Sequence, residues 1–310
     1  MTAANAWAQA LTTLDAQVAH REPAWRASEP AFRTAKCVLQ RGLLGSVQAI
    51  VKSLGPREGP WRWYFARERA LYRALRTAPF ALRTPSLLVD HADTDWIILE
   101  AIDGQAVSST RACRAPWPTE VRENLLRDLG VLSAISPTDL RWPALAPSDS
   151  ERAALRARLL EDPSAPTAWI TEGLARAGHI GLLDEASAAL ALEALAQDPT
   201  VASAHGDLLL RNVLATATHE LIWIDWECAG SHHRHWDLAL LWINATAPDR
   251  GAIESQVSAD VVAQRSFAAC ALFACARERL YRQRSGARDT RGQWLRDAEA
   301  LLTARLRPLC

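Results

Sequence analysis

The sequence predicts an α+β fold with two lobes, a small strand-rich N-terminal lobe and a larger, mainly helical C-terminal lobe. Two patterns support this prediction. Short β-prone runs bounded by turn residues fill much of residues 1–102. Leucines and alanines spaced three and four apart dominate residues 103–310. The stretch EAIDGQ, which follows the last strand-like run, has the character of a linker, so we place the lobe boundary after residue 102.

In the small lobe, we expect two neighbouring strands to be joined by a tight hairpin at Gly42 and Gly45. The run WRWYFARERALYRALR, residues 61–76, has helical spacing and is the one helix expected in the first hundred residues. The strands predicted in this lobe are 35–40, 47–54, 87–89 and 96–99.

In the large lobe, apolar residues at helical spacing predict a series of helices, interrupted by two short strands at 213–214 and 221–224. A hairpin centred between Thr218 and His219 would pair residue 213 with residue 224. The predicted helices are 119–135, 151–162, 182–198, 236–245, 261–283 and 292–306.

Charge and cysteine content exclude several classes of protein. The 35 Lys and Arg residues balance 35 Asp and Glu residues, so no overall field attracts nucleic acid or an anionic membrane. No apolar run approaches the ~18–20 residues of a membrane span, and the first residues lack the pattern of a secretory signal. The six cysteines form no CxxC pair, which favours free thiols. We therefore expect a cytoplasmic protein with a small-molecule partner.

Lysine is rare in this chain, which has 2 lysines and 33 arginines. Where arginine is the usual basic residue, a lysine indicates that a compact ammonium group is needed. Lys52 lies on the second predicted strand, and Glu68 lies on the helix that follows it.

The segment AHGDLLLRNVLATATHELIWIDWE gives the strongest local signal. The predicted hairpin would place Asn212 opposite Asp225, close to Asp207. An amide oxygen and carboxylates that converge in this way form a hard oxygen site suited to Mg²⁺ and phosphates.

With these residues, HGDxxxxN followed by an apolar strand and IDWE, the sequence resembles aminoglycoside phosphotransferases and choline-kinase-type small-molecule kinases, distant relatives of protein kinases. The resemblance implies a protein-kinase-like fold. It also implies Mg²⁺-dependent transfer of the γ-phosphoryl group of ATP, or GTP, to a hydroxyl of a small molecule. Asp207 would accept or orient the hydroxyl proton, and His205 would brace its loop. Asn212 and Asp225 would hold Mg²⁺.

The same resemblance assigns the nucleotide contacts of the small lobe. Lys52 would bind phosphate and Glu68 would be its ion-pair partner, although Glu58 and the neighbouring arginines offer Lys52 and Glu68 other partners. The carbonyl of Glu100 and the amide of Ile102 would bind the adenine edge.

Two departures from the family pattern keep alternatives open. The stretch Ser28–Ala35 contains no glycine, so the usual glycine-rich phosphate cover is missing or replaced, and a non-catalytic nucleotide-binding pseudokinase scaffold remains an alternative. Residues 261–310 contain ten arginines and only four acidic residues. Because such a positively charged segment would repel a polycationic acceptor, this excess argues against one.

The histidines of the segment HHRH could bind zinc or nickel, so a histidine metalloprotein is a further hypothesis beside the kinase and the pseudokinase scaffold. We expect instead that its histidines, His232, His233 and His235, line the acceptor cleft or face solvent. Asp237, just beyond them, is placed to cap a helix or to brace the catalytic loop.

Overall fold

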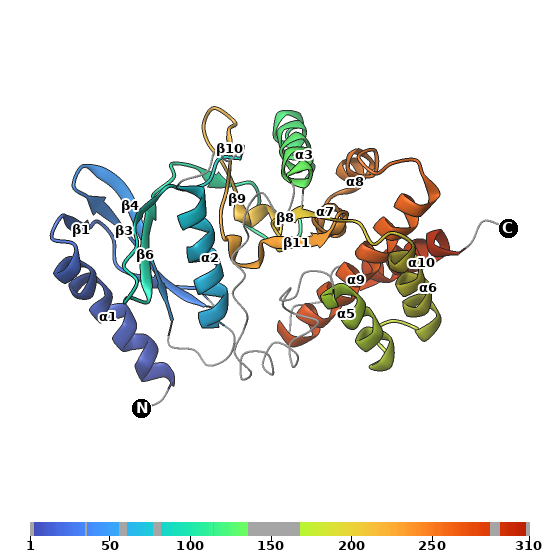
Figure 1. The fold of residues 1–310 in the computed structure, drawn as a ribbon, viewed down its shortest axis with the longest axis horizontal. Helices are drawn as coiled ribbons and strands as arrows, with labels where there is room; N and C mark the ends of the chain where they lie inside the picture. The colour runs from blue at the N-terminus through green and yellow to red at the C-terminus, as the bar shows by residue number, and fades with distance from the viewer. Residues whose placement is uncertain are drawn as a thin grey trace.

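A strand-rich lobe and a helical lobe lie side by side in the computed structural model, as Figure 1 shows. The predicted two-lobed α+β fold is therefore confirmed. The residues that the structure describes are 3–34, 36–55, 61–76, 82–113, 115–135, 168–285 and 292–307.

An antiparallel sheet forms the small lobe, with strand order β1-β3-β4-β6-β5 and with β2 also paired to β3. The predicted strands 87–89 and 96–99 are found as β5 and β6. The bounds are β1 Trp25–Ala27, β2 Phe32–Arg33, β3 Cys37–Leu44, β4 Val47–Leu54, β5 Leu87–Val89 and β6 Trp96–Glu100.

Two helices cover this sheet, one on each face (Figure 1). Helix α1 (Ala3–Arg21) packs on the face that carries Ala49 and Val51, and helix α2 (Trp61–Leu75) packs on the other. Because side chains alternate along a strand, Lys52 of β4 points to the face opposite Val51, toward α2 and the second lobe.

Two predictions for the small lobe were wrong. Helix α1 was not expected, although its buried Trp7, Leu14 and Val18 recur at helical spacing. Gly42 lies inside β3, where an added Cβ would come within 2.5 Å of the Trp25 ring, so Gly42 serves close packing rather than a turn. Only Gly45 lies in the hairpin turn, with a φ of 63°.

The large lobe is built around α9, whose middle is buried on all sides and which contacts α5, α6, α7 and α10. Small sheets, β10-β9-β7 and β11-β8, lie between α9 and the first lobe. The helices are α3 Thr119–Ala134, α5 Ala168–His179, α6 Glu185–Gln197, α7 Trp236–Asn244, α8 Ala247–Glu254, α9 Val261–Ser285 and α10 Gly292–Leu306. The strands are β7 Gln105–Ala106, β8 Val201–Ala204, β9 Val213–Ala215, β10 Leu221–Trp223 and β11 Gly230–His233.

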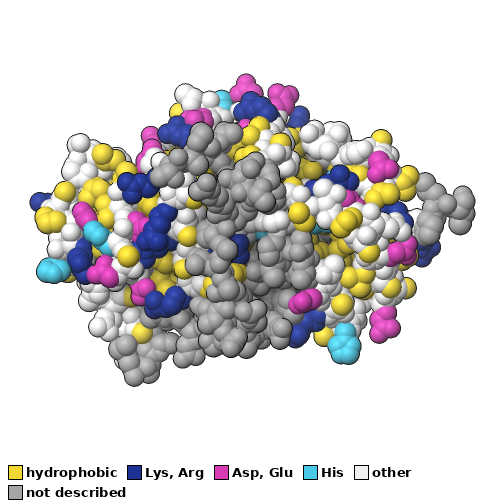
Figure 2. Space-filling model, in the orientation of Figure 1, with side chains coloured by type: hydrophobic (Ala, Val, Ile, Leu, Met, Phe, Trp, Pro, Cys, Tyr) yellow, Lys and Arg dark blue, Asp and Glu magenta, His cyan; other side chains and the backbone are white. Residues whose placement is uncertain are grey.

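The helix predicted over 151–162 lies outside the described residues. Among the described helices, none combines the length and the apolar character required to cross a bilayer. Basic and acidic side chains are interspersed on the face of the molecule drawn in Figure 2.

Candidate active site

The loop after β8 carries His205, Gly206 and Asp207, and a buried carboxylate holds its backbone. Asp237, in the first turn of α7, accepts hydrogen bonds from the backbone amides of His205 at 2.7 Å and Gly206 at 3.0 Å. The expected bracing role of Asp237 is confirmed. Its role as a helix cap is wrong, because the residue at the N-cap position of α7 is His235.

The loop requires glycine at position 206. Its φ is +84°, and an added Cβ would lie 2.1 Å from the carbonyl oxygen of Cys228. A side chain would therefore be strained by the backbone angle and would also clash with a neighbouring segment. The glycine thus allows the loop to lie directly against the residues that follow Asp225.

His205 joins this loop to the strand before Asp225. Its Nε2 lies 2.9 Å from the carbonyl oxygen of Ile224, and because a carbonyl only accepts, Nε2 carries the proton. The imidazole packs on the indole of Trp226, with ring centroids 4.7 Å apart. The ring is fully buried, so it fixes the distance between the loop and the segment that carries Asp225.

The β9–β10 hairpin has a register one residue different from the prediction. Val213 pairs with Trp223, and the amide of Ile224 donates to the carbonyl of Asn212 at 2.9 Å. Residues 216–220 join the strands, so the connection has an odd rather than an even number of residues. The amide of Thr216 closes it by donating to the carbonyl of Glu220 at 3.0 Å, and His219 lies in the left-handed region (φ 61°). Asp225 therefore does not face Asn212 across the ladder. It lies two residues beyond the end of β10, itself in a left-handed conformation with a φ of 63°.

Both residues nevertheless line one cavity. Asn212 and Asp225 from the large lobe and Lys52 from the small lobe border a cavity of about 450 Å³, within the range of small-molecule sites. The Asn212 side-chain NH₂ donates to the carbonyl of Asp207 at 3.0 Å, a contact that uses the amide nitrogen and not the amide oxygen.

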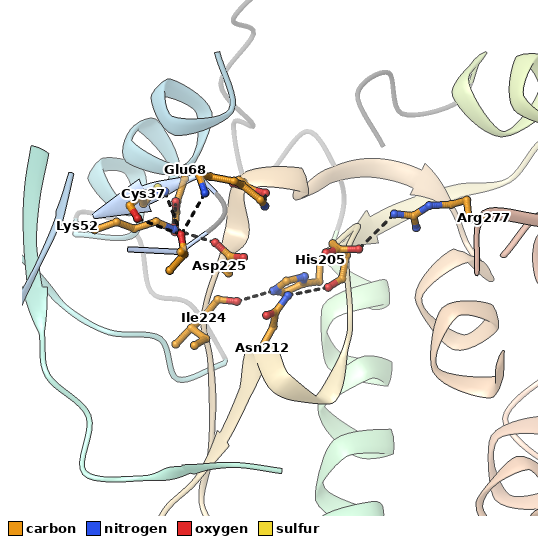
Figure 3. A network of polar contacts seen from close by, with 12 residues as sticks. Cys37, Lys52, Glu68, His205, Asn212, Ile224, Asp225 and Arg277 are labelled. Atoms are coloured by element: carbon orange, nitrogen blue, oxygen red, sulfur yellow. Dashed lines mark hydrogen bonds and ion pairs between the residues drawn. The ribbon is translucent and has the colours of Figure 1, made fainter. Parts of the chain in front are cut away.

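Lys52 lies between two carboxylates, as Figure 3 shows. Its Nζ is 2.6 Å from Glu68 Oε2 and 2.8 Å from Asp225 Oδ1. Burial lowers the pKa of Lys52, but attraction by Asp225 and Glu68 outweighs burial and holds the pKa well above its usual value. For Asp225, burial raises the pKa, but the positive charges of Lys52 and Lys36 have the larger effect, and the pKa is lowered below its usual value. The ammonium and the Asp225 carboxylate are therefore both charged at neutral pH.

A third carboxylate lies at the same place. Within the described part of the chain, oxygens of Glu68, Asp225 and Glu227 lie within 4.8 Å of one another. Glu227 belongs to the short 3₁₀ turn Trp226–Cys228 that follows Asp225, and it forms an ion pair with Lys36.

The expected hinge residues also border this cavity. Glu100 ends β6, and both Glu100 and Ile102 line the cavity with the apolar side chain of Leu99. The Glu100 carboxylate accepts hydrogen bonds from the amide of Ser86 at 3.1 Å and from its hydroxyl at 2.9 Å. Its side chain is therefore held by the small lobe.

Asp207 faces an arginine that the sequence did not single out. Arg277 of α9 lies 3.4 Å from Asp207 Oδ1, and both side chains are buried (Figure 3). Burial raises the pKa of Asp207, but Arg277 and then Arg111 outweigh it, so the pKa is lowered. Asp207 is thus a carboxylate at neutral pH. Arg111 itself lies 2.6 Å from Glu278.

The histidines of the HHRH segment are held inside the large lobe. His232, His233 and His235 are all buried, so the expectation that they face solvent is wrong. His232 bonds the carbonyl of Cys228 and His233 that of Asp198, at 2.9 and 2.8 Å. Burial lowers the pKa of His232 to about 4 and that of His235 to about 3. They are neutral members of the core, none of them lines the cavity described above, and they belong to no three-residue metal cluster in the described chain.

Helix α2 is tied to the segment that follows Asp225. The buried Arg67 guanidinium donates to the carbonyl of Ala229, and Cys228 packs against Trp61, Trp63 and Tyr64. Because Glu68 follows Arg67 directly, this attachment also fixes the partner of Lys52.

Sequence reasoning missed three residues of the site, namely Lys36, Glu227 and Arg277. Lys36 had a signal, because it is the other lysine of the chain. Glu227 is part of the IDWE motif, but nothing in the sequence shows that it turns back toward Lys36. Arg277 was one of ten arginines in its segment, and its contact with Asp207 spans 70 residues.

Comparison with known proteins agrees with this geometry. Residues 49–281 match the model of the phosphotransferase enzyme family. The fold is similar to that of a macrolide 2'-phosphotransferase from Brachybacterium faecium, with a TM-score of 0.59 at 15% identity over 97% of this chain and 99% of that one. A choline/ethanolamine kinase family protein from Mesorhizobium loti gives a TM-score of 0.56 at 17% identity over 95% and 92%.

A thermostable mutant of an aminoglycoside phosphotransferase, solved with ADP and hygromycin B, gives a TM-score of 0.57 at 13% identity over 96% of this chain and 100% of that one. A search of curated proteins gives no match. The fold and the site define a small-molecule kinase. The chain belongs to the phosphotransferase enzyme family, as its sequence motif indicated.

Proposed function

We propose that this phosphotransferase uses ATP or GTP, with Mg²⁺, to phosphorylate a hydroxyl group of a small molecule. The observation that carries the proposal is the position of Lys52. Its ammonium lies within hydrogen-bond distance of Glu68 in its own lobe and of Asp225 in the other lobe, at one wall of the same cavity.

The cavity supports binding of a nucleotide along its length. The base would lie beside the hinge, against the carbonyl of Glu100 and the amide of Ile102, and its phosphates would extend toward Lys52. Glu68, almost completely buried, holds Lys52 in that direction.

The side chains around Asp225 suit a hard cation. The carboxylate of Asp225 and the amide oxygen of Asn212 are oxygen donors of the kind that Mg²⁺ prefers, and the Glu227 carboxylate lies beside that of Asp225. When bound there, Mg²⁺ neutralises the phosphate charge.

Asp207 would hold the acceptor. Its carboxylate accepts the hydrogen bond of the acceptor hydroxyl, whose oxygen forms a new bond to the γ-phosphorus as the bond to the leaving diphosphate breaks. The proton passes to Asp207. The low pKa that Arg277 gives Asp207 makes it a weak base, which fits a proton transfer late in the reaction.

The charge beside Asp207 bears on the acceptor. Arg277 touches the catalytic carboxylate, and the attraction of Arg111 also reaches it. A polycationic acceptor would be repelled by both guanidinium groups, so we propose a neutral or anionic hydroxyl compound.

Two variants test the proposal. Asp207→Asn should keep nucleotide affinity and lose most turnover, whereas Asp225→Ala should weaken nucleotide binding in Mg²⁺ but not in metal-free buffer. Calorimetry with ATP and GTP measures binding, and product formation over a panel of neutral, cationic and anionic alcohols measures turnover. Mg²⁺-dependent nucleotide binding without turnover on any acceptor would favour the pseudokinase scaffold, for which the glycine-free turn before β3 is the motivating observation.

A further inference from the structure

Lys36 occupies the turn that leads from β2 into β3, next to the strand that carries Lys52. The turn lies at the edge of the cavity, which Lys36 lines together with Lys52, Asn212 and Asp225. Only two lysines occur in the chain, and both border this cavity.

The backbone of this turn is already engaged. The hydroxyl oxygen of Thr34 accepts hydrogen bonds from the amides of Lys36 at 3.2 Å and Cys37 at 3.0 Å. In a glycine-rich loop, such amides would point at a phosphate. In this chain a threonine side chain takes them, so the turn can offer phosphate a side chain but not these two amides.

The position of Lys36 is well fixed. Its carbonyl accepts a hydrogen bond from the amide of Gly55 at 2.9 Å, which ties the turn to the end of β4, three residues beyond Lys52. Its Nζ lies 5.6 Å from the centre of the Trp61 ring. The side chain therefore projects over the cavity from a defined anchor.

In the structure, the Lys36 ammonium forms an ion pair with Glu227, a residue of the other lobe. Its charge also reaches Asp225 and Asp207. Two ammonium groups, Lys36 and Lys52, thus face three carboxylates. A cation bound by the carboxylates and a phosphate chain bound by the ammonium groups would complement this arrangement.

We propose that Lys36 binds the β- or γ-phosphate of the donor nucleotide, in place of the backbone amides of a glycine-rich loop, and that it leaves Glu227 to do so. The proposal rests on the proposed function, because it needs a nucleotide in this cavity. Lys36 is then a positioning residue that closes the small lobe on the phosphates, and its departure frees the Glu227 carboxylate beside Asp225.

The test compares ligands that differ by one phosphate. Adenosine, AMP and ADP are titrated calorimetrically into wild type, Lys36→Ala and Lys36→Arg in metal-free buffer. A hydrogen bond to a charged group corresponds to about 10–100-fold in affinity. Lys36→Ala should therefore lose about tenfold or more of the gain from AMP to ADP, with adenosine binding unchanged, and Lys36→Arg should keep most of that gain.

Glu227→Gln separates a phosphate contact from a simple tie between the lobes. If Lys36 binds phosphate, Glu227→Gln releases it, and ADP should bind as tightly as to wild type or more tightly. If the ion pair only holds the lobes together, both variants should weaken adenosine, AMP and ADP alike. Arg33→Ala, which removes a neighbouring exposed charge that does not line the cavity, is the matched control and should behave as wild type.

A second measurement needs no variant. An acyl-phosphate derivative of ATP transfers its acyl group to a nearby lysine amine, forming an amide and releasing the nucleotide. With two lysines in the chain, mass spectrometry should find both Lys36 and Lys52 acylated, and ADP should suppress both reactions more than AMP does. The proposal is overturned if Lys52 is acylated and Lys36 is not. It is also overturned if the ratio of the ADP affinity to the AMP affinity is the same in Lys36→Ala as in wild type. A wild-type protein that binds none of the nucleotides overturns the proposed function instead.

Discussion

The buried carboxylate of Asp237 offers a direct test of how the loop that carries Asp207 is held. Asp237→Ala leaves the amides of His205 and Gly206 buried with no acceptor from this side chain. Each unsatisfied amide costs about 1–3 kcal/mol, so the two together cost about 2–6 kcal/mol. Burial raises the pKa of Asp237, so removal of the carboxylate also relieves an unfavourable charge. We therefore expect Asp237→Ala to lower the unfolding free energy by about 3 kcal/mol, in the lower half of that range.

The measurement is urea unfolding at pH 7.5, followed by the fluorescence of the 13 tryptophans. Asp237→Asn keeps one oxygen acceptor and should lose about half as much stability as Asp237→Ala. Asp260→Ala is the matched control, because Asp260 is exposed and caps α9 through the amide of Ala263 at 3.1 Å. Loss of such a cap costs about 1 kcal/mol.

A catalytic readout distinguishes bracing from general stability. In the folded fraction of Asp237→Ala, the loop that carries Asp207 is no longer fixed, and a shift of about 1 Å lowers turnover about a hundredfold. The KM for nucleotide should change little, since Lys52 and Asp225 are untouched. If Asp237→Ala is no less stable than Asp260→Ala and turns over at the wild-type rate, the bracing argument is refuted.

Three further predictions follow from the same structure. Burial lowers the pKa of His235 to about 3 from 6.5, so the stability that depends on its neutral form is complete above pH 6.5 and falls by about 2 kcal/mol on going to pH 5. His235→Leu should reduce this fall in the unfolding free energy, measured by urea unfolding. The same dependence on pH in wild type and variant would contradict the prediction. Gly206→Ala should lower the unfolding free energy by about 3 kcal/mol or more, because the new Cβ meets the Cys228 carbonyl at a left-handed φ; a thermal midpoint equal to that of wild type would show that the loop relaxes. Lys52→Met should lower the unfolding free energy by about 3 kcal/mol, because it leaves Glu68 buried without its cation. The double variant Lys52→Met/Glu68→Leu should recover part of that stability. Strictly additive effects in the double-mutant cycle would rule out a coupling between the two residues.

Local sequence patterns predicted those parts of the fold that depend on local physics. Residues 61–76 became helix α2, and the runs 87–89 and 96–99 became strands, because apolar spacing and flanking turn residues act within a few residues of each other. The order of Lys52 and Glu68 along the chain also led to a pair that is present in the structure.

The remaining features depend on geometry that spacing does not encode. The register of the β9–β10 hairpin was wrong by one residue because it is decided by a left-handed residue, His219, in the turn. Gly42 was assigned to a turn because a glycine required by close packing looks the same in a sequence as one required by a bend. The contacts of Lys36 with Glu227 and of Arg277 with Asp207 join residues far apart in the chain. No local pattern could reveal them.

The attachment of α2 to the backbone of Ala229 has a consequence for control of the enzyme. A helix bonded to the segment that follows Asp225 is restrained from moving outward alone, since Glu68 and Asp225 would have to move together. An on–off switch based on displacing that helix would have to break this attachment. The contacts of Lys52 with Glu68 and Asp225 therefore need no separate movement of α2 to form, and in the proposed nucleotide complex only Lys36 has to change its partner.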